Sequence, residues 1–226
     1  MKIIISGATG QIGKHLLKRL DLTSNEYVLV TRRAESLADL ATQGATIAEG
    51  DLEDKKFLES TLKDGDVYFF LPPPDFSSPD MVAAYERLAQ ASREAALANG
   101  IKRVVHLSTL GAHIDNRETG LIYGQHLAEK IIAGSAPNVL HLRNGFFLEN
   151  YFASAQTIKQ DGAIYLPVNG EARYRFVSTE DIAVSLAARL PAIFAGWRGV
   201  AARGRWRHAP RLGSKMEGAV WRPECR

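Results

Sequence analysis

Three glycines near the start of the chain stand at a spacing that suits phosphate binding. They follow the short apolar segment Ile3–Ile5 and open a segment of helical period. The first glycine permits a tight turn, the second lets backbone approach a pyrophosphate, and the third lets the helix pack closely on the strand. This G-x-x-G-x-x-G run predicts a dinucleotide site, and a tight turn without a ligand is the alternative. The candidate contacts are Gly7, Ala8, Thr9, Gly10, Gln11, Ile12 and Gly13.

The residues after the second apolar segment indicate which dinucleotide is bound. In NAD sites an acidic residue about 20 positions beyond the glycines holds the ribose 2′-hydroxyl. Thr31, Arg32 and Arg33 occupy that place instead. A guanidinium there would stack on adenine and pair with a 2′-phosphate. We therefore expect NADP(H) as the preferred coenzyme and NAD(H) as the second choice, with Arg32 as the first candidate contact and Arg33 as the second. Two solvated loop arginines are the alternative.

Two further pairs follow predicted strands, at the sheet edge where ligands bind. Asp51 could accept a hydrogen bond from the adenine amino group, with Leu52 against the ring. Asp51 could equally be the N-cap of a helix that starts near Glu53. Leu71 and Pro72 end the next strand, where prolines stiffen a loop that we expect to pass under the coenzyme.

The elements that must position these residues alternate in type. Short β-type apolar runs and longer helical segments are typical of βα units around a parallel sheet. This predicts an α/β fold with a doubly wound, mostly parallel Rossmann sheet flanked by helices. The expected strands are Lys2–Ser6, Tyr27–Thr31, Thr46–Ala48, Val67–Leu71, Arg103–Leu107 and Val139–Leu142. The expected helices are Gln11–Leu20, Met81–Asn99, one at about Glu149–Lys159, and one from the N-cap Ser178 to about Leu190, preceded by an extended stretch at Ala172–Phe176.

Composition fits one main soluble domain. Of 226 residues, 46% are apolar and 23% are charged, and no apolar run reaches the about 18 residues of a membrane span. We therefore expect a cytoplasmic protein with no membrane partner. The single cysteine, Cys225, can form no intrachain disulfide, and the histidine and cysteine spacings predict no metal site.

The end of the chain has a different character. Residues 189–226 hold eight arginines and one lysine against two glutamates, together with all three tryptophans. No period of 2 or 3.6 persists beyond Leu190. We expect residues 1–190 to form the coenzyme domain and the start of a substrate lobe, and residues 191–226, the C-terminal tail, to be an irregular and frame-shifted ending. The tail's pattern is not amphipathic, so we expect no nucleic-acid partner and no membrane contact.

With these residues in place, the chain resembles the NmrA-like group of atypical short-chain dehydrogenases, and within it the bacterial NAD(P)H:quinone reductases. The likeness spans roughly residues 1–188. It rests on the glycine run, on Arg32, on His126-x-x-Glu129-Lys130 and, most specifically, on the segment 142–151, Leu-Arg-Asn-Gly-Phe-Phe-Leu-Glu-Asn-Tyr. The resemblance implies that Asn144, Gly145 and Phe146 contact coenzyme or substrate. It also implies a substrate lobe that is incomplete here, because relatives continue further.

Reduction of a carbonyl by hydride needs a proton donor, which short-chain dehydrogenases supply with Tyr-x-x-x-Lys. This sequence departs from that pattern, because Lys130 is seven residues from Tyr123. His126 and Lys130 have the i, i+4 spacing instead. We expect His126 to protonate a quinone oxygen and Lys130 to assist or to contact ribose or nicotinamide; an exposed polar helix face without a catalytic task is the alternative.

Further polar residues end or lie within the fifth strand. The resemblance places Ser108 and Thr109 as hydroxyls that face the substrate, although either could simply cap the strand. His113 and His106 are weaker candidates, and His106 lies within the strand.

Two functions follow from these residues. The first is an NADPH-dependent oxidoreductase that transfers hydride to a quinone or a similar small electron acceptor. The second is a non-catalytic NAD(P)(H)-binding redox sensor that signals to a regulatory protein partner, because the tyrosine and lysine pattern is missing. A homodimer is compatible with either function.

Overall fold

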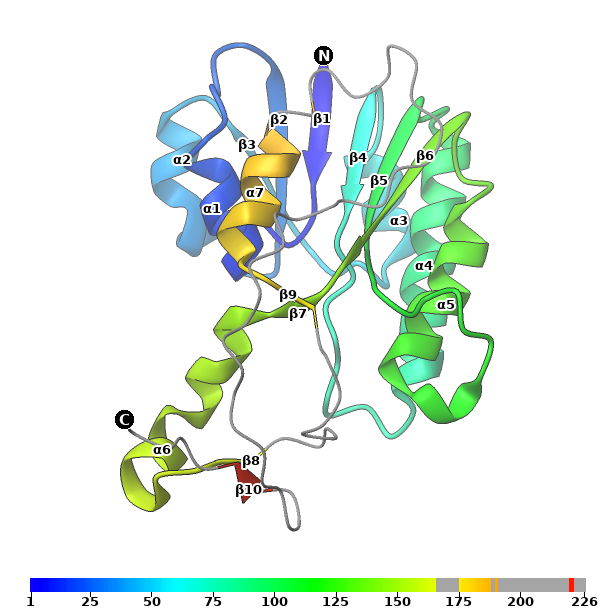
Figure 1. The fold of residues 1–226 in the computed structure, drawn as a ribbon. Helices are drawn as coiled ribbons and strands as arrows, with labels where there is room; N and C mark the ends of the chain where they lie inside the picture. Colours follow the sequence, from blue (N-terminus) through cyan, green and yellow to red (C-terminus); the bar gives the residue numbers. More distant parts are fainter. Residues whose placement is uncertain (166–174, 188–189, 191–219, 222–226) are drawn as a thin grey trace.

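A single parallel sheet organises the protein. The computed structural model describes residues 1–165, 175–187, 190 and 220–221. Six strands form one sheet in the order β3-β2-β1-β4-β5-β6, which is the doubly wound order (Figure 1). The strands are β1 Lys2–Ile5, β2 Glu26–Thr31, β3 Thr46–Glu49, β4 Val67–Phe70, β5 Arg103–Thr109 and β6 Asn138–Asn144. All five pairings are parallel, so the predicted fold class and all six predicted strands are confirmed.

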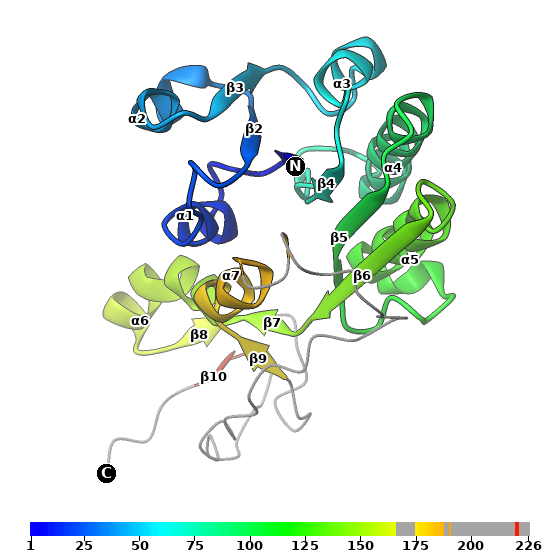
Figure 2. The same ribbon diagram turned by 90° about the horizontal axis from the view of Figure 1, so that it is seen from above.

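Helices cover both faces of the sheet. Figure 2 shows α3, α4 and α5 along one face and α1 and α7 along the other. The helices are α1 Gln11–Leu17, α2 Ala38–Thr42, α3 Lys55–Thr61, α4 Met81–Ala98, α5 Leu121–Ile132, α6 Ala155–Asp161 and α7 Thr179–Ala187. Within the described residues, 3₁₀ segments lie at Ala34–Leu37, Arg117–Thr119 and Leu148–Ser154. No helix in the described part of the chain is long and apolar enough to cross a membrane.

The core has two halves because side chains alternate across each strand. In β1, Ile3 and Ile5 pack with Leu16 of α1 and Ile182 of α7. Ile4 points to the other face, into the core that α3, α4 and α5 close. Strands of a parallel sheet that are covered on both faces read as continuous apolar runs, which explains why this run was recognisable in the sequence.

Several helix boundaries differ from the sequence predictions. The helix predicted at about Glu149–Lys159 is a 3₁₀ segment, Leu148–Ser154, followed by α6. The helix α3 begins at Lys55, and its N-cap is Asp54, which accepts a hydrogen bond from the Phe57 amide. The predicted capping role of Asp51 is therefore wrong. Its carboxylate accepts a hydrogen bond from the Glu53 amide, in the turn that precedes α3. The helix α1 ends at Leu17 rather than Leu20, because the chain tightens there into a turn in which the Arg19 amide donates to the Leu16 carbonyl.

A smaller region follows β6. Its strands are β7 Phe146–Phe147, which pairs with β9 Phe176–Val177, and β8 Ile164–Tyr165, which pairs with β10 Val220–Trp221. Ser178 accepts from the Asp181 amide at the start of α7, as its predicted N-cap role requires. Of the expected extended stretch 172–176, residues 172–174 lie outside the described part, as do residues 191–219 and 222–226 of the C-terminal tail.

Candidate functional site

The glycine run forms a tight turn at the carboxyl end of β1, the central strand. Gly7 has φ +71, a conformation that favours glycine, and its carbonyl accepts from the Gly10 amide at 3.0 Å. A Cβ on Gly13 would lie within 3.0 Å of the Gly7 and Ala8 carbonyls, so only glycine fits where the helix crosses the turn. Gly10 is exposed, and as N-cap of α1 it makes no side-chain capping bond. The turn thus presents backbone amides at the sheet edge, as a pyrophosphate requires.

Within the predicted run, side chains and backbone have separate tasks. Ala8 and Ile12 are buried in the core between sheet and α1, so only their backbone can meet a ligand. Thr9 is half-buried, and Gln11 is exposed. The run is therefore held to the core by Ala8 and Ile12, while Gly10 and Gln11 are exposed to solvent.

Ser6 ties the turn to the next strand, and sequence reasoning missed it. Its buried hydroxyl donates to the Phe69 carbonyl at 3.0 Å and accepts from the Leu71 amide at 2.8 Å. Leu71 also lies against the position of a Gly7 Cβ, and Pro72 is buried beyond it. The predicted loop residues Leu71 and Pro72 are thus fixed directly beside the glycine turn. A serine at the end of an apolar run carries no sequence signal for this role.

The two arginines follow β2 at the same edge and are both exposed. Thr31 shapes this corner, because its hydroxyl oxygen accepts from the Arg33 amide at 3.1 Å. The pKa of Asp75, in the loop after β4, is lowered, chiefly by the Ser77 hydroxyl and amide and more weakly by the charge of Arg32. In strand order β1 lies between β2, which Arg32 follows, and β4, which Asp75 follows.

Asp51 and Leu52 follow β3, one strand further out. Asp51 is exposed, and Leu52 is half-buried against the core beneath α3 and α4. The strand order therefore separates this pair from the glycine turn by β2.

The ends of β5 and β6 form the other half of the edge. Their register pairs Ser108 with Arg143 and Thr109 with Asn144. Ser108 and Asn144 are buried, whereas Thr109 is half-buried. The Asn144 carbonyl accepts from the Leu110 amide at 2.8 Å, so the two strands stay paired to their last residues.

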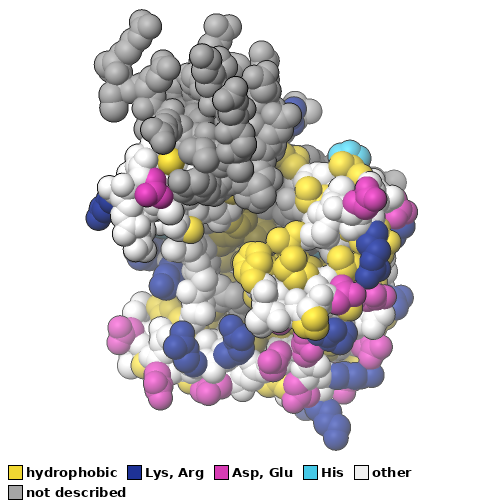
Figure 3. Space-filling view, turned by 90° about the horizontal axis from the view of Figure 1, so that it is seen from below, with side chains coloured by type: hydrophobic (Ala, Val, Ile, Leu, Met, Phe, Trp, Pro, Cys, Tyr) yellow, Lys and Arg dark blue, Asp and Glu magenta, His cyan; other side chains and the backbone are white. Residues whose placement is uncertain are grey.

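The chain leaves the sheet immediately afterwards, at Gly145 and Phe146. A Cβ on Gly145 would lie within 3.0 Å of the Arg175 carbonyl, so glycine allows the two segments to touch. The Phe146 amide donates to that carbonyl at 2.8 Å. The rings of Phe146, Tyr151 and Phe176 pack on one another with centroids 5.7–6.1 Å apart. An aromatic wall therefore begins where the predicted coenzyme contacts end. Figure 3, which views the molecule from the carboxyl edge, shows hydrophobic side chains around a hollow.

A buried charged cluster, also missed by sequence reasoning, joins these strands to α5. Glu129 is 6% exposed. Its carboxylate accepts from the Ser108 hydroxyl at 2.5 Å and from Arg143 through Nε at 2.9 Å and Nη2 at 2.5 Å. Burial opposes ionisation of Glu129, but the hydrogen bonds from Arg143 and Ser108 outweigh it and lower its pKa. The carboxylate is therefore charged and held by both strands.

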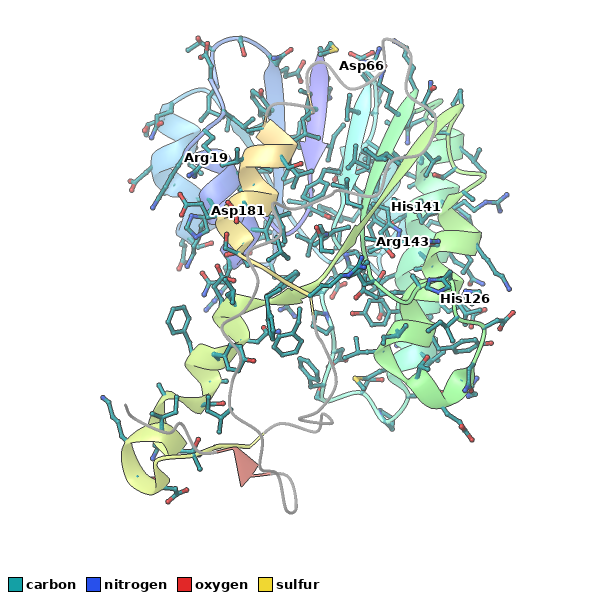
Figure 4. The ribbon with its side chains drawn as sticks, in the orientation of Figure 1. Arg19, Asp66, His126, His141, Arg143 and Asp181 are labelled. Atoms are coloured by element: carbon teal, nitrogen blue, oxygen red, sulfur yellow. The ribbon has the colours of Figure 1, made fainter. Side chains whose placement is uncertain are left out.

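The histidine of the predicted catalytic pair is not on an exposed face. His126 is 7% exposed, and its Nδ1 lies 2.8 Å from the Ala112 carbonyl. Its Nε2 lies 3.5 Å from Asp115. Lys130, which is exposed, binds the same carboxylate at 3.1 Å. Asp115, which precedes α5, thus contacts both His126 and Lys130 of that helix, on which Figure 4 labels His126. Among the residues that the structure describes, no group of three or more potential ligands could hold a metal ion.

Two other histidines form a buried pair. His106 is fully buried, and its Nδ1 lies 3.1 Å from Nδ1 of His141 in the neighbouring strand. Burial and the adjacent His141 lower the pKa of His106 to about 3. This neutral ring is a core residue, which fits its position in the middle of β5. His113 is exposed in the loop after β5.

Comparison with known proteins agrees with this geometry. The NAD(P)H-binding family matches residues 7–189, and the chain belongs to that family. It is 29% identical over 187 residues to quinone oxidoreductase 2 of Escherichia coli and 28% identical over 182 residues to an NAD(P)H azoreductase of Xenophilus azovorans. These matches cover 82% and 80% of this chain but only 62% and 60% of those proteins. The chain therefore spans about three fifths of the length of its curated relatives.

A solved structure shares the fold. The NADPH-dependent quinone oxidoreductase of Escherichia coli, complexed with NADPH, superposes with a TM-score of 0.71 at 24% identity. The match covers 97% of this chain and 71% of that one. Fold, glycine turn and family together establish an NAD(P)H-binding protein.

Proposed function

We propose that this protein is an NADPH-dependent oxidoreductase that reduces quinones or similar small aromatic electron acceptors. The observation that carries the proposal is the glycine turn after β1, whose tight backbone packing suits a pyrophosphate; in strand order, β2 with Arg32 at its end lies on one side of β1, and β4, β5 and β6 lie on the other. When bound, a reduced nicotinamide coenzyme supplies hydride for such a reduction. Relatives named for quinone and azo substrates support an aromatic acceptor.

The residues divide the proposed site into two halves. The turn 7–13 holds the pyrophosphate, Arg32 and Arg33 select the 2′-phosphate, and Leu71 and Pro72 support the ribose. On the far side Ser108, Thr109 and Asn144–Phe146 receive the nicotinamide, and the aromatic wall that begins at Phe146 stacks on the acceptor ring. In this arrangement Asp51 and Leu52 meet only the adenine.

For proton transfer we propose His126, because histidine is the side chain that most often acts as a general acid or base in enzymes. Its ring must leave Asp115 to reach an acceptor, and Lys130 retains that carboxylate when it does. His126→Asn should lower kcat and leave NADPH affinity unchanged. Unchanged turnover in this variant would place the donor elsewhere.

The decisive test is oxidation of NADPH by this chain with a panel of quinones and one azo dye. Turnover that saturates with the acceptor supports the proposal. Tight NADPH binding without turnover of any acceptor would overturn it.

A non-catalytic redox sensor is the second candidate. A specific observation favours it: Nδ1 of His126 is bound to the Ala112 carbonyl, its Nε2 is buried without a hydrogen-bond partner among the described residues, and Lys130 is paired at the surface. A sensor needs coenzyme binding but no free proton donor. A protein partner whose binding changes with NADP⁺, in a chain that turns over no acceptor, would establish this function; indifference of every partner to the coenzyme would remove it.

A further inference from the structure

Glu129 of α5 connects two neighbouring strands of the sheet. Its carboxylate, which belongs to a residue only 6% exposed, is bound both by Ser108, the next-to-last residue of β5, and by Arg143, the next-to-last residue of β6. Arg143 approaches in the forked geometry, with Nε and Nη2 both donating. Because Ser108 and Arg143 are register partners, the carboxylate spans the two strands at a single level. Figure 4 shows Arg143 and His141 near the end of β6, on the strand next to α5.

Stability alone is a weak explanation for this arrangement. Taking a carboxylate and a guanidinium out of water is costly, and well-packed apolar residues often serve a core equally well. What a forked, charge-assisted pair provides is fixed geometry. Here the fixed geometry is the spacing between the carboxyl ends of β5 and β6, measured at the level of Ser108.

The next residues along both strands are the ones assigned to the nicotinamide half of the site. Thr109 pairs with Asn144, and Leu110 donates to the Asn144 carbonyl. Gly145 then packs against the Arg175 backbone, so the chain at Gly145 has little room to compensate for a displacement of the preceding residue. A shift of β6 against β5 at Arg143 would therefore pass directly to Asn144.

We propose that Glu129 is a positioning residue that sets the nicotinamide half of the coenzyme site by clamping β5 and β6 through Ser108 and Arg143. The inference rests on the proposed function, because it uses the assignment of Asn144–Phe146 to the nicotinamide. It separates the site into an adenosine half, fixed by β1, β2 and β4, and a nicotinamide half, fixed from α5.

The test compares two probes on three variants. NADPH occupies both halves of the site, whereas adenosine 2′,5′-bisphosphate lacks the nicotinamide and occupies only the adenosine half. Glu129→Gln keeps the size of the side chain and removes its charge. Arg143→Lys keeps the charge pair and removes the fork. Asp66→Asn is the matched control, because Asp66 accepts from Lys102 and from the Lys2 amide at the opposite edge of the sheet, where Figure 4 labels it.

Glu129→Gln should weaken NADPH binding about tenfold, the effect of losing one charge-assisted pair, and leave the bisphosphate within about twofold. Arg143→Lys should shift NADPH in the same direction and also spare the bisphosphate. The fluorescence of bound NADPH should move towards that of free NADPH in both variants. Asp66→Asn should leave both affinities within about twofold, as expected for a site far from the coenzyme.

The outcomes distinguish failure of the coenzyme site from failure of the positioning role of Glu129. If the unaltered chain binds neither probe, the proposed coenzyme site itself is wrong. If it binds both, and Glu129→Gln and Arg143→Lys weaken both probes equally or neither, the site stands and the positioning role is overturned. Should Glu129→Gln fail to fold, Arg143→Lys decides alone.

Discussion

Replacing Gly10 with alanine should weaken coenzyme binding with little change in the free energy of unfolding, because this glycine is exposed on the side where a ligand would approach. Its backbone, with φ −72 and ψ 173, is one that alanine adopts without strain. The only atom within 4 Å of an added Cβ is the Gly7 carbonyl oxygen, at 3.3 Å. This contact is tight, so the unliganded protein accepts the methyl group only with a shift of that carbonyl by a few tenths of an ångström, whereas a pyrophosphate packed on this backbone would collide with the methyl group.

The two expected effects differ in size. Alanine restricts the unfolded chain, which stabilises the fold by about 0.4–1 kcal/mol, but it is a poorer N-cap than glycine by a similar amount. The free energy of unfolding should thus stay within about 1 kcal/mol of the parent. Loss of one amide contact to an anionic phosphate costs about 1.5–3 kcal/mol, which corresponds to roughly a 10–100-fold weaker Kd for NADPH.

Calorimetric titration with NADPH and urea unfolding measure the two quantities on the same samples. Gly134→Ala is the control, since its Cβ would meet only the Arg93 side chain at an ordinary 3.4 Å. Gly13→Ala provides the contrast: its methyl group would collide with backbone, so it should lose both stability and binding. A Gly10→Ala protein that binds NADPH as tightly as the parent would refute the reasoning about this turn.

Three further predictions concern the same fold and site. Arg32→Gln should raise the Kd for NADPH by about tenfold and leave that for NADH nearly unchanged, because only NADPH carries the 2′-phosphate; equal losses for both coenzymes would show that Arg32 does not read it. The pKa of the buried His106 is lowered to about 3, whereas in the unfolded chain this histidine binds a proton below about pH 6.5. The free energy of unfolding should therefore be highest above pH 6.5 and should fall by about 2 kcal/mol between pH 6.5 and pH 5. Urea unfolding at both pH values measures this, and a His106→Gln variant with an equally steep loss would assign the effect to other groups. Asp54→Ala should destabilise the protein by about 1 kcal/mol through loss of the α3 cap, whereas Asp51→Ala should cost less; the reverse order in thermal unfolding would contradict the observed cap.

Local patterns in the sequence were enough for the main elements. The strands β1 and β4 are nearly all apolar on both faces, and a glycine run between a strand and a helix is typical of a dinucleotide site, so β1, its turn and α1 followed from neighbouring residues alone. The choice between Asp51 and Asp54 as a helix cap could not be made that way. The two residues are three positions apart, and only the backbone geometry shows which one begins α3.

Contacts between distant residues could not be predicted. Glu129 on a helix reads as a solvated charge, and its burial follows only when β5 and β6 are known to be neighbours in register with Ser108 opposite Arg143. The alternative for His126, an exposed helix face without a catalytic task, is wrong for the same reason. His126 is buried because the irregular loop after β5 returns over α5 and brings Ala112 and Asp115 onto its ring.

Backbone amides of residues 7–13, with Arg32 beside them, are proposed to bind NADPH. Titration of the isotope-labelled protein with NADPH, followed by amide chemical shifts, tests this directly. We expect the largest saturable shifts at residues 7–13 and at Arg32, with smaller ones at Ser108 and Asn144. Shifts confined to other parts of the chain, or none at NADPH concentrations well above those in cells, would contradict it.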